Sequence, residues 1–209
     1  MTVAQEKALI ALDPYLRTLR TLCLDSWQDY QSYPVDKRAV HDSTTRANIV
    51  HSHWVQRAAQ YAELTPGWEL LNLTRLHVLV ARVGDIVFAL RMKKVDGELR
   101  SSNVTTQQIE DFRNQEPLEG IPEACHLELG YMLNASATAV SGIYLICPSG
   151  KGVLWSVEIK AESVETVIAD LYANREPAAP EDQGAILRPK RTESETTESP
   201  LEGTTGHET

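Results

Sequence analysis

Cysteine is scarce in this chain of 209 residues, and its spacing is uninformative. Only Cys23, Cys125 and Cys147 are present, and no two stand at CxxC spacing. An odd number without paired spacing predicts reduced thiols, and neither a disulfide framework nor a thiolate metal site. No apolar run reaches the ~20 residues of a membrane-spanning helix, and Met1 to Ile10 lack the charged-then-apolar pattern of a secretory signal. These absences favour a cytoplasmic protein that makes no membrane contact.

The sequence also lacks the short motifs of common enzymes. It contains no GxSxG nucleophile elbow, no glycine-rich phosphate loop and no His-Glu-x-x-His helix. Six histidines invite a metal hypothesis, but His51 and His53 are two residues apart on a predicted helix and therefore point to different sides. We expect no metal site and no cofactor. Enzymatic activity stays open, and the missing catalytic motifs favour a protein without it.

Large apolar residues nearly disappear after Asn174. The net charge of the whole chain is −9, and residues 175–209 contain eight acidic and four basic side chains. We predict one globular domain over residues 1–174 and an acidic disordered tail over residues 175–209. The acidic balance disfavours broad nucleic-acid binding. Within the tail, an apolar pair beside three basic residues predicts a short docking motif, or else a chance pair in a linker: Ile186, Leu187, Arg188, Lys190 and Arg191.

Apolar spacing indicates helices in the first third of the chain. Residues 1–40 are predicted to be helical, with Asp13-Pro14 separating a short first helix from a second. Asp42 or Ser43 is expected to cap a long helix that runs to about Glu63. A further short helix is expected after Thr105 or Thr106, and a last one over 162–172.

Strand patterns occupy the rest of the domain. Residues 73–83 and 86–94 predict a hairpin through Gly84-Asp85, and residues 126–133, 139–147 and 153–160 predict a three-stranded meander. The expected fold class is α+β, with an antiparallel sheet of about five strands packed with helices in the order α-α-β-β-α-β-β-β-α. The second face of the hairpin is apolar in its middle, so we expect a helix or a partner to cover it.

Basic residues gather near the hairpin and suggest a binding surface. Arg82, Arg91 and Lys93 share one strand face, and Lys94 and Arg100 lie close by in the sequence. Such a surface would suit phosphate, an acidic protein surface or the chain's own acidic tail. The alternative is a solvated end of a sheet with no ligand.

Two other functions are compatible with the pattern. A metal-dependent nuclease would use Glu158 and Lys160, which form a Glu-x-Lys tripeptide on a strand, together with Asp85 at the hairpin turn. Against it, Glu158 and Lys160 occupy the polar face of an amphipathic strand. A homo-oligomeric structural protein would instead bury the second hairpin face against its own copy.

Four segments carry a resemblance to a group of bacterial proteins. They are residues 41–46, residues 89–94 with 99–103, residues 118–122, and residues 145–148 before Trp155. They resemble uncharacterised proteins encoded with helix-turn-helix regulators and ImmA/IrrE-type metallopeptidases on mobile elements. The resemblance implies a regulatory, antitoxin-like or defence-associated role and a regulator or peptidase as partner. We therefore expect a non-catalytic protein-binding or regulatory module.

Overall fold

The computed structural model describes residues 2–73, 76–101 and 106–161. Contacts divide the chain into Met1–Asn174 and Arg175–Thr209. The helix expected over residues 162–172 and the tail motif from Ile186 to Arg191 lie outside the described residues. Within those residues, no helix combines the length and the apolar character needed to cross a bilayer.

Three helices open the chain: α1 spans Gln5–Gln31, α2 spans Val35–Ala39 and α3 spans Ser43–Leu64. The predicted cap of the long helix is confirmed, because the Asp42 carboxylate accepts a hydrogen bond from the Thr45 backbone N–H at 2.7 Å. One face of this helix packs into the core through Val50, Trp54 and Ala58.

The predicted helix break at Asp13-Pro14 is wrong, since α1 continues through Pro14. A proline inside a helix removes one hydrogen bond and normally costs about 3 kcal/mol. Burial of the flanking leucines offsets this cost, because the stripe that packs into the core runs through both sides of the proline: Leu9, Leu12, Leu16 and Leu19.

Six strands form a single mixed sheet in the order β1-β2-β3-β4-β5-β6. In chain order they span Trp68–Leu73, Leu76–Val83, Ile86–Val95, Cys125–Leu133, Val140–Ser149 and Gly152–Glu158. The predicted hairpin register is confirmed, with Val83 opposite Ile86 and Ala81 opposite Phe88. The α+β class is therefore correct, and the strands of the predicted meander are present.

Two details of the predicted sheet are wrong. The expected strand over residues 73–83 is shorter, and a separate strand β1 precedes it, so the sheet has six strands and not five. The expected all-antiparallel pairing also fails, because β3 and β4 are parallel. Helix α4, Gln107–Arg113, lies in the connection between them, and such a crossover lets the chain enter β4 in the same direction as β3.

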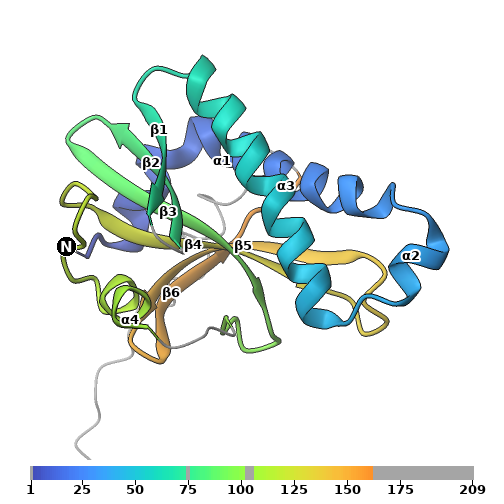
Figure 1. Ribbon diagram of the computed structural model, residues 1–209. Helices are drawn as coiled ribbons and strands as arrows, with labels where there is room; N and C mark the ends of the chain where they lie inside the picture. Colours follow the sequence, from blue (N-terminus) through green and yellow to red (C-terminus); the bar gives the residue numbers. More distant parts are fainter. Residues whose placement is uncertain (1, 74–75, 102–105, 162–209) are drawn as a thin grey trace, which may run out of the picture. The chain divides into compact units, whose positions relative to one another are not determined.

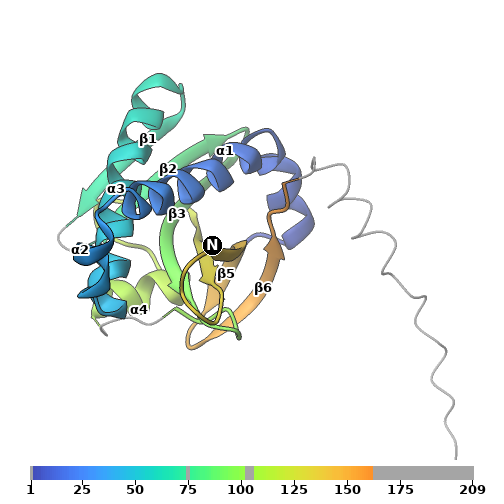
Figure 2. The same cartoon turned by 90° about the vertical axis from the view of Figure 1, so that its right-hand side faces the viewer.

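The two faces of the sheet are covered by different elements. Helices α1 and α3 pack on one face, where they bury the main core around Trp54, Phe88 and Leu127. Helix α4 and the loop after it cover part of the second face, where Phe112, Leu118 and Ile121 pack against β2 and β3. Figure 1 shows α1 and α3 on one side of the sheet and α4 on the other. Figure 2 shows the strands from the side, with β1 and β6 at opposite edges.

The packing of α4 shows which element covers the second face of the hairpin. The sequence leaves open whether a helix or a partner covers it, and the structure shows that α4 does so. This packing buries the middle of the hairpin face within the chain, and the homo-oligomer alternative stays a prediction.

Candidate functional site

A buried carboxylate stands at the centre of the second sheet face. The parallel register places Glu128 of β4 directly opposite Arg91 of β3, so both side chains point to the same side. Glu128 Oε1 accepts hydrogen bonds from Arg91 Nη2 at 2.7 Å and Arg113 Nη1 at 2.9 Å, and from Ser101 Oγ at 3.2 Å. The Glu128 side chain is 0% exposed, and Arg91 and Arg113 are 3% and 10% exposed. We call Arg91, Lys93, Arg113 and Glu128 the charged cluster.

Arg113 enters the cluster from the last turn of α4 and ties three parts of the fold together. Its Nε donates to the Gly150 carbonyl at 2.6 Å, and its Nη2 donates to the Gly152 carbonyl at 3.1 Å, both at the β5–β6 turn. The Arg91 guanidinium lies 4.7 Å from the centre of the Phe112 ring, within the range of a cation–π contact. These contacts fix both guanidinium groups in place.

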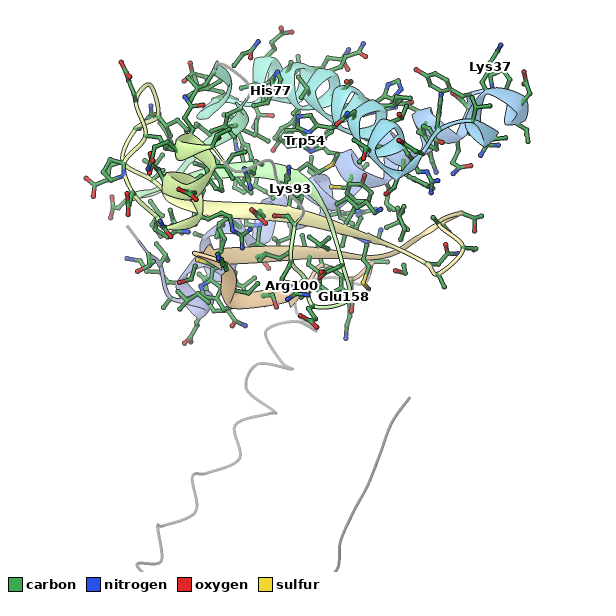
Figure 3. The ribbon with its side chains drawn as sticks, turned by 60° about the horizontal axis from the view of Figure 1, so that its bottom comes forward. Lys37, Trp54, His77, Lys93, Arg100 and Glu158 are labelled. Atoms are coloured by element: carbon green, nitrogen blue, oxygen red, sulfur yellow. The ribbon has the colours of Figure 1, made fainter. Side chains whose placement is uncertain are left out.

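Lys93 lies two residues beyond Arg91 on the same side of β3 and is partly exposed. The pKa of Lys93 is lowered to about 8, mainly by burial and also by the positive charges of Arg91 and Arg113, which act against the attraction of Glu128. Within the described residues, Lys93 makes no hydrogen bond or ion pair. In Figure 3, Lys93 lies over the middle of the sheet. The amino group is therefore the part of the charged cluster that solvent reaches.

The five basic residues expected to form one binding surface do not come together. Arg91 is 2% exposed and paired with Glu128, so the expectation that it meets a partner at the surface fails. Lys94 points to the opposite face and donates to Ser43 Oγ at 2.7 Å. Arg100 is exposed and pairs with Asp96 and Glu98. Arg82 is exposed near the hairpin turn. Of the predicted surface, only Arg91 and Lys93 lie in one cluster.

The residues of the nuclease alternative are far apart. Glu158 lies at the same position along the strand direction as Lys93. Lys93 is opposite Gly130, Gly130 is opposite Tyr144, and Tyr144 is opposite Glu158. Asp85 lies eight residues before Lys93, which corresponds to roughly 26 Å along the strand, and three strand spacings add roughly 14 Å across the sheet. Asp85 and Glu158 therefore cannot hold one metal ion.

The described residues offer no other assembled catalytic group. No cluster of three or more histidine, cysteine or carboxylate side chains within them is placed to hold a metal ion. All three cysteines are buried, and burial raises the pKa of Cys23 far above its usual range. A thiol that stays protonated is a poor nucleophile, which argues against Cys23; the pKa of Cys125 is instead lowered, mainly by a hydrogen bond with Cys147.

A second exposed feature lies at the turn between α1 and α3. Residues 32–42, which we call the elbow, contain α2, and none of the residues of α2 is buried. Three large apolar side chains are exposed there: Tyr33 by 37%, Val35 by 72% and Val40 by 80%. They are half of the six large exposed apolar side chains found in the described residues. Figure 1 shows α2 lying away from the sheet.

Ion pairs and aromatic contacts hold the base of the elbow. Arg57 of α3 binds Asp29 of α1 through two hydrogen bonds, Nε to Oδ2 at 2.6 Å and Nη2 to Oδ1 at 2.8 Å. The Tyr33 ring meets the His53 ring edge-on at 5.8 Å. The Arg57 guanidinium holds the pKa of Asp29 below its usual range. The elbow is therefore presented on a fixed base rather than on a loose loop.

Sequence reasoning missed the elbow and two members of the charged cluster. The prediction of helices over residues 1–40 gives no sign that Val35 and Val40 are exposed. Glu128 is a single charge in an otherwise apolar strand, and such a residue needs a buried partner. Arg113 could not be matched with it from sequence, since the pairing depends on where α4 packs.

No family model, no curated protein and no solved structure matches this chain. The resemblance to proteins encoded with mobile-element regulators therefore stays a prediction.

Proposed function

We propose that this chain is a non-catalytic protein-binding module of a regulatory system, and that the elbow is the surface that contacts the partner. The observation that carries the proposal is the concentration of exposed Tyr33, Val35 and Val40 around a helix that buries none of its own residues. Exposed apolar residues that come together on a soluble protein often mark a binding site, and these three lie within eight residues of the chain.

The chemistry of the elbow defines the partner that would fit it. A short helix with apolar side chains suits a hydrophobic groove on another protein. Lys37 is 70% exposed beside this apolar surface and lies 4.0 Å from the exposed Asp36, and with Arg38 the helix α2 carries one more basic than acidic side chain. We therefore expect a protein partner whose apolar groove carries a carboxylate at its rim. The resemblance described above is consistent with a partner of the regulator or peptidase type in a bacterial mobile-element, toxin-antitoxin or defence system.

Replacing Val35 and Val40 together by serine is expected to abolish partner binding and leave the fold intact. Both side chains are highly exposed, so the free energy of unfolding should change by less than ~0.5 kcal/mol per site. The measurement is quantitative mass spectrometry of proteins captured by the full-length chain from cells, followed by affinity measurement with the purified partner.

The matched control is Leu154→Ser. Leu154 is 55% exposed on β6 and lies outside the elbow. A partner that binds the wild type and the Leu154→Ser variant, but not the Val35→Ser/Val40→Ser variant, would support the proposal. Equal binding by all three proteins would exclude the elbow as the contact surface.

A further inference from the structure

The charged cluster contains more positive than negative charge. Among the described residues of the cluster, Arg91, Arg113 and Lys93 accompany the single carboxylate of Glu128, so the cluster has two more positive than negative charges when Lys93 is protonated. On this face of β6, Glu158 is level with Lys93 but roughly 14 Å away across three strand spacings.

An excess of this kind is unfavourable where little water is present. Buried charges need countercharges, because protein atoms solvate ions poorly. The carbonyl groups of Gly150 and Gly152 and the ring of Phe112 stabilise the guanidinium groups but carry no net charge. The low pKa of Lys93 reflects the same imbalance, since repulsion by the two arginines and burial outweigh the attraction of Glu128. An anion beside Lys93 would remove the imbalance.

We propose that the charged cluster is a binding site for the phosphate group of a small molecule. The Lys93 amino group contacts the phosphate oxygens directly, because it is the member of the cluster that solvent reaches. Arg91 and Arg113 act mainly through their charge, as their side chains are 3% and 10% exposed. Glu128 holds both guanidinium groups in position behind the site.

Charge decides between phosphate and carboxylate. A phosphate monoester carries about −1.5 to −2 at pH 7, which matches the two excess positive charges, whereas a carboxylate would neutralise only one of them. A long polyanion is a poorer match, because Lys93 is the single partly exposed cation of the cluster and the whole chain has a net charge of −9. The proposal does not depend on the elbow, so either can fail alone.

The test is calorimetric titration of the full-length protein with inorganic phosphate at pH 7 and constant ionic strength. We expect saturable binding at one site, and Lys93→Gln should weaken it about tenfold or more, because a charge-assisted contact is lost. Lys93→Arg should retain most of the affinity. Lys37→Gln, at an exposed lysine on α2, is the matched control and should bind like the wild type. Melting temperatures of the variants establish that they fold.

Further ligands identify the chemistry of the anion. Glycerol phosphate that binds more tightly than inorganic phosphate would point to a phosphorylated small molecule, and equal affinities would point to the phosphate ion; both outcomes support the site. Acetate that binds as tightly as phosphate would overturn the assignment of phosphate. Failure of the wild type to saturate below about 10 mM phosphate, or unchanged affinity in Lys93→Gln, would overturn the proposal altogether.

Chemical modification gives a second readout that does not use affinity. A lysine with a pKa of about 8 has a larger neutral fraction at pH 7 than an ordinary lysine, so Lys93 should react readily with acetic anhydride. Phosphate bound there should protect it, and mass spectrometry should show a lower yield of acetylated Lys93 but an unchanged yield at Lys37. Equal yields at Lys93 with and without phosphate would contradict the site.

Discussion

Glu128→Gln is expected to lower the free energy of unfolding by about 3–5 kcal/mol. Glutamine has nearly the same shape as glutamate, and its amide oxygen can still accept hydrogen bonds from Arg91 and Arg113. The substitution therefore removes the charge and little else. Because Glu128 is fully buried, no water replaces that charge, and two guanidinium groups are left without their countercharge. Urea unfolding at pH 7 in phosphate-free buffer measures the loss.

Two further variants separate this effect from a general loss of a carboxylate. Glu158→Gln removes an exposed carboxylate from the same face of the sheet and should change stability by less than ~0.5 kcal/mol. Adding Arg91→Met to Glu128→Gln should recover part of the stability. The double variant lacks both charges of the Arg91–Glu128 pair, so one buried guanidinium fewer is left without a countercharge. A loss below about 1 kcal/mol in Glu128→Gln would mean that solvent reaches the cluster and shields it.

The alternation of residues along the strands was informative, because all the side chains on one face of a strand have the same kind of surroundings. The alternation in β2 and β3 correctly placed Arg82, Arg91 and Lys93 on one side of the hairpin and predicted the register through Val83 and Ile86. It could not show how much of that side is buried. Burial of Arg91 depends on α4 and on β4, which follow much later in the chain, so local periodicity contains no information about it.

The errors in the fold have similar causes. Strand β1 was missed because the reversal between Leu73 and Leu76 contains no glycine, proline or asparagine, the residues that usually mark a turn. The parallel pairing of β3 and β4 was missed because consecutive strands were assumed to be joined by hairpins. The helix cap at Asp42, in contrast, depends on residues within one turn and was predicted correctly.

The candidate sites were harder to predict from the sequence than the fold. The elbow depends on α1 and α3 packing side by side, and the charged cluster depends on a parallel register that brings Glu128 opposite Arg91. Both arise from contacts between residues distant in sequence. Composition and spacing could show that Arg91 and Lys93 share a face, but not that one would be buried by a carboxylate and the other left open to solvent.

His51 is expected to make the fold less stable in weak acid. Its ring lies in α3, 5.5 Å from the ring of His77 on β2, and stacks on Trp54 at 6.0 Å. The pKa of His51 is lowered to about 4, mainly by burial and also by the charges of His77, Lys93 and Arg91. His51 is therefore neutral in the folded protein at pH 5, where the unfolded chain would bind a proton at this residue.

The direction of the pH effect follows from this difference. A histidine with a depressed folded pKa contributes its full stability above its unfolded pKa of about 6.5, and that contribution is lost as the pH falls from about 6.5 to about 4. A shift of this size corresponds to about 3 kcal/mol. Carboxylates with lowered pKa values, such as Asp29, lose their contributions only at lower pH, so they do not account for a loss in this window.

The measurement is urea unfolding at pH 7.5 and pH 4.5 for the wild type, His51→Leu and His53→Gln. We expect the wild type and His53→Gln to lose about 2–3 kcal/mol more than His51→Leu between the two values. A smaller loss should persist in His51→Leu, because burial also lowers the pKa of His126. If His51→Leu loses as much stability in acid as the wild type, the acid sensitivity arises elsewhere, and the contact between α3 and β2 is not where protonation destabilises the fold.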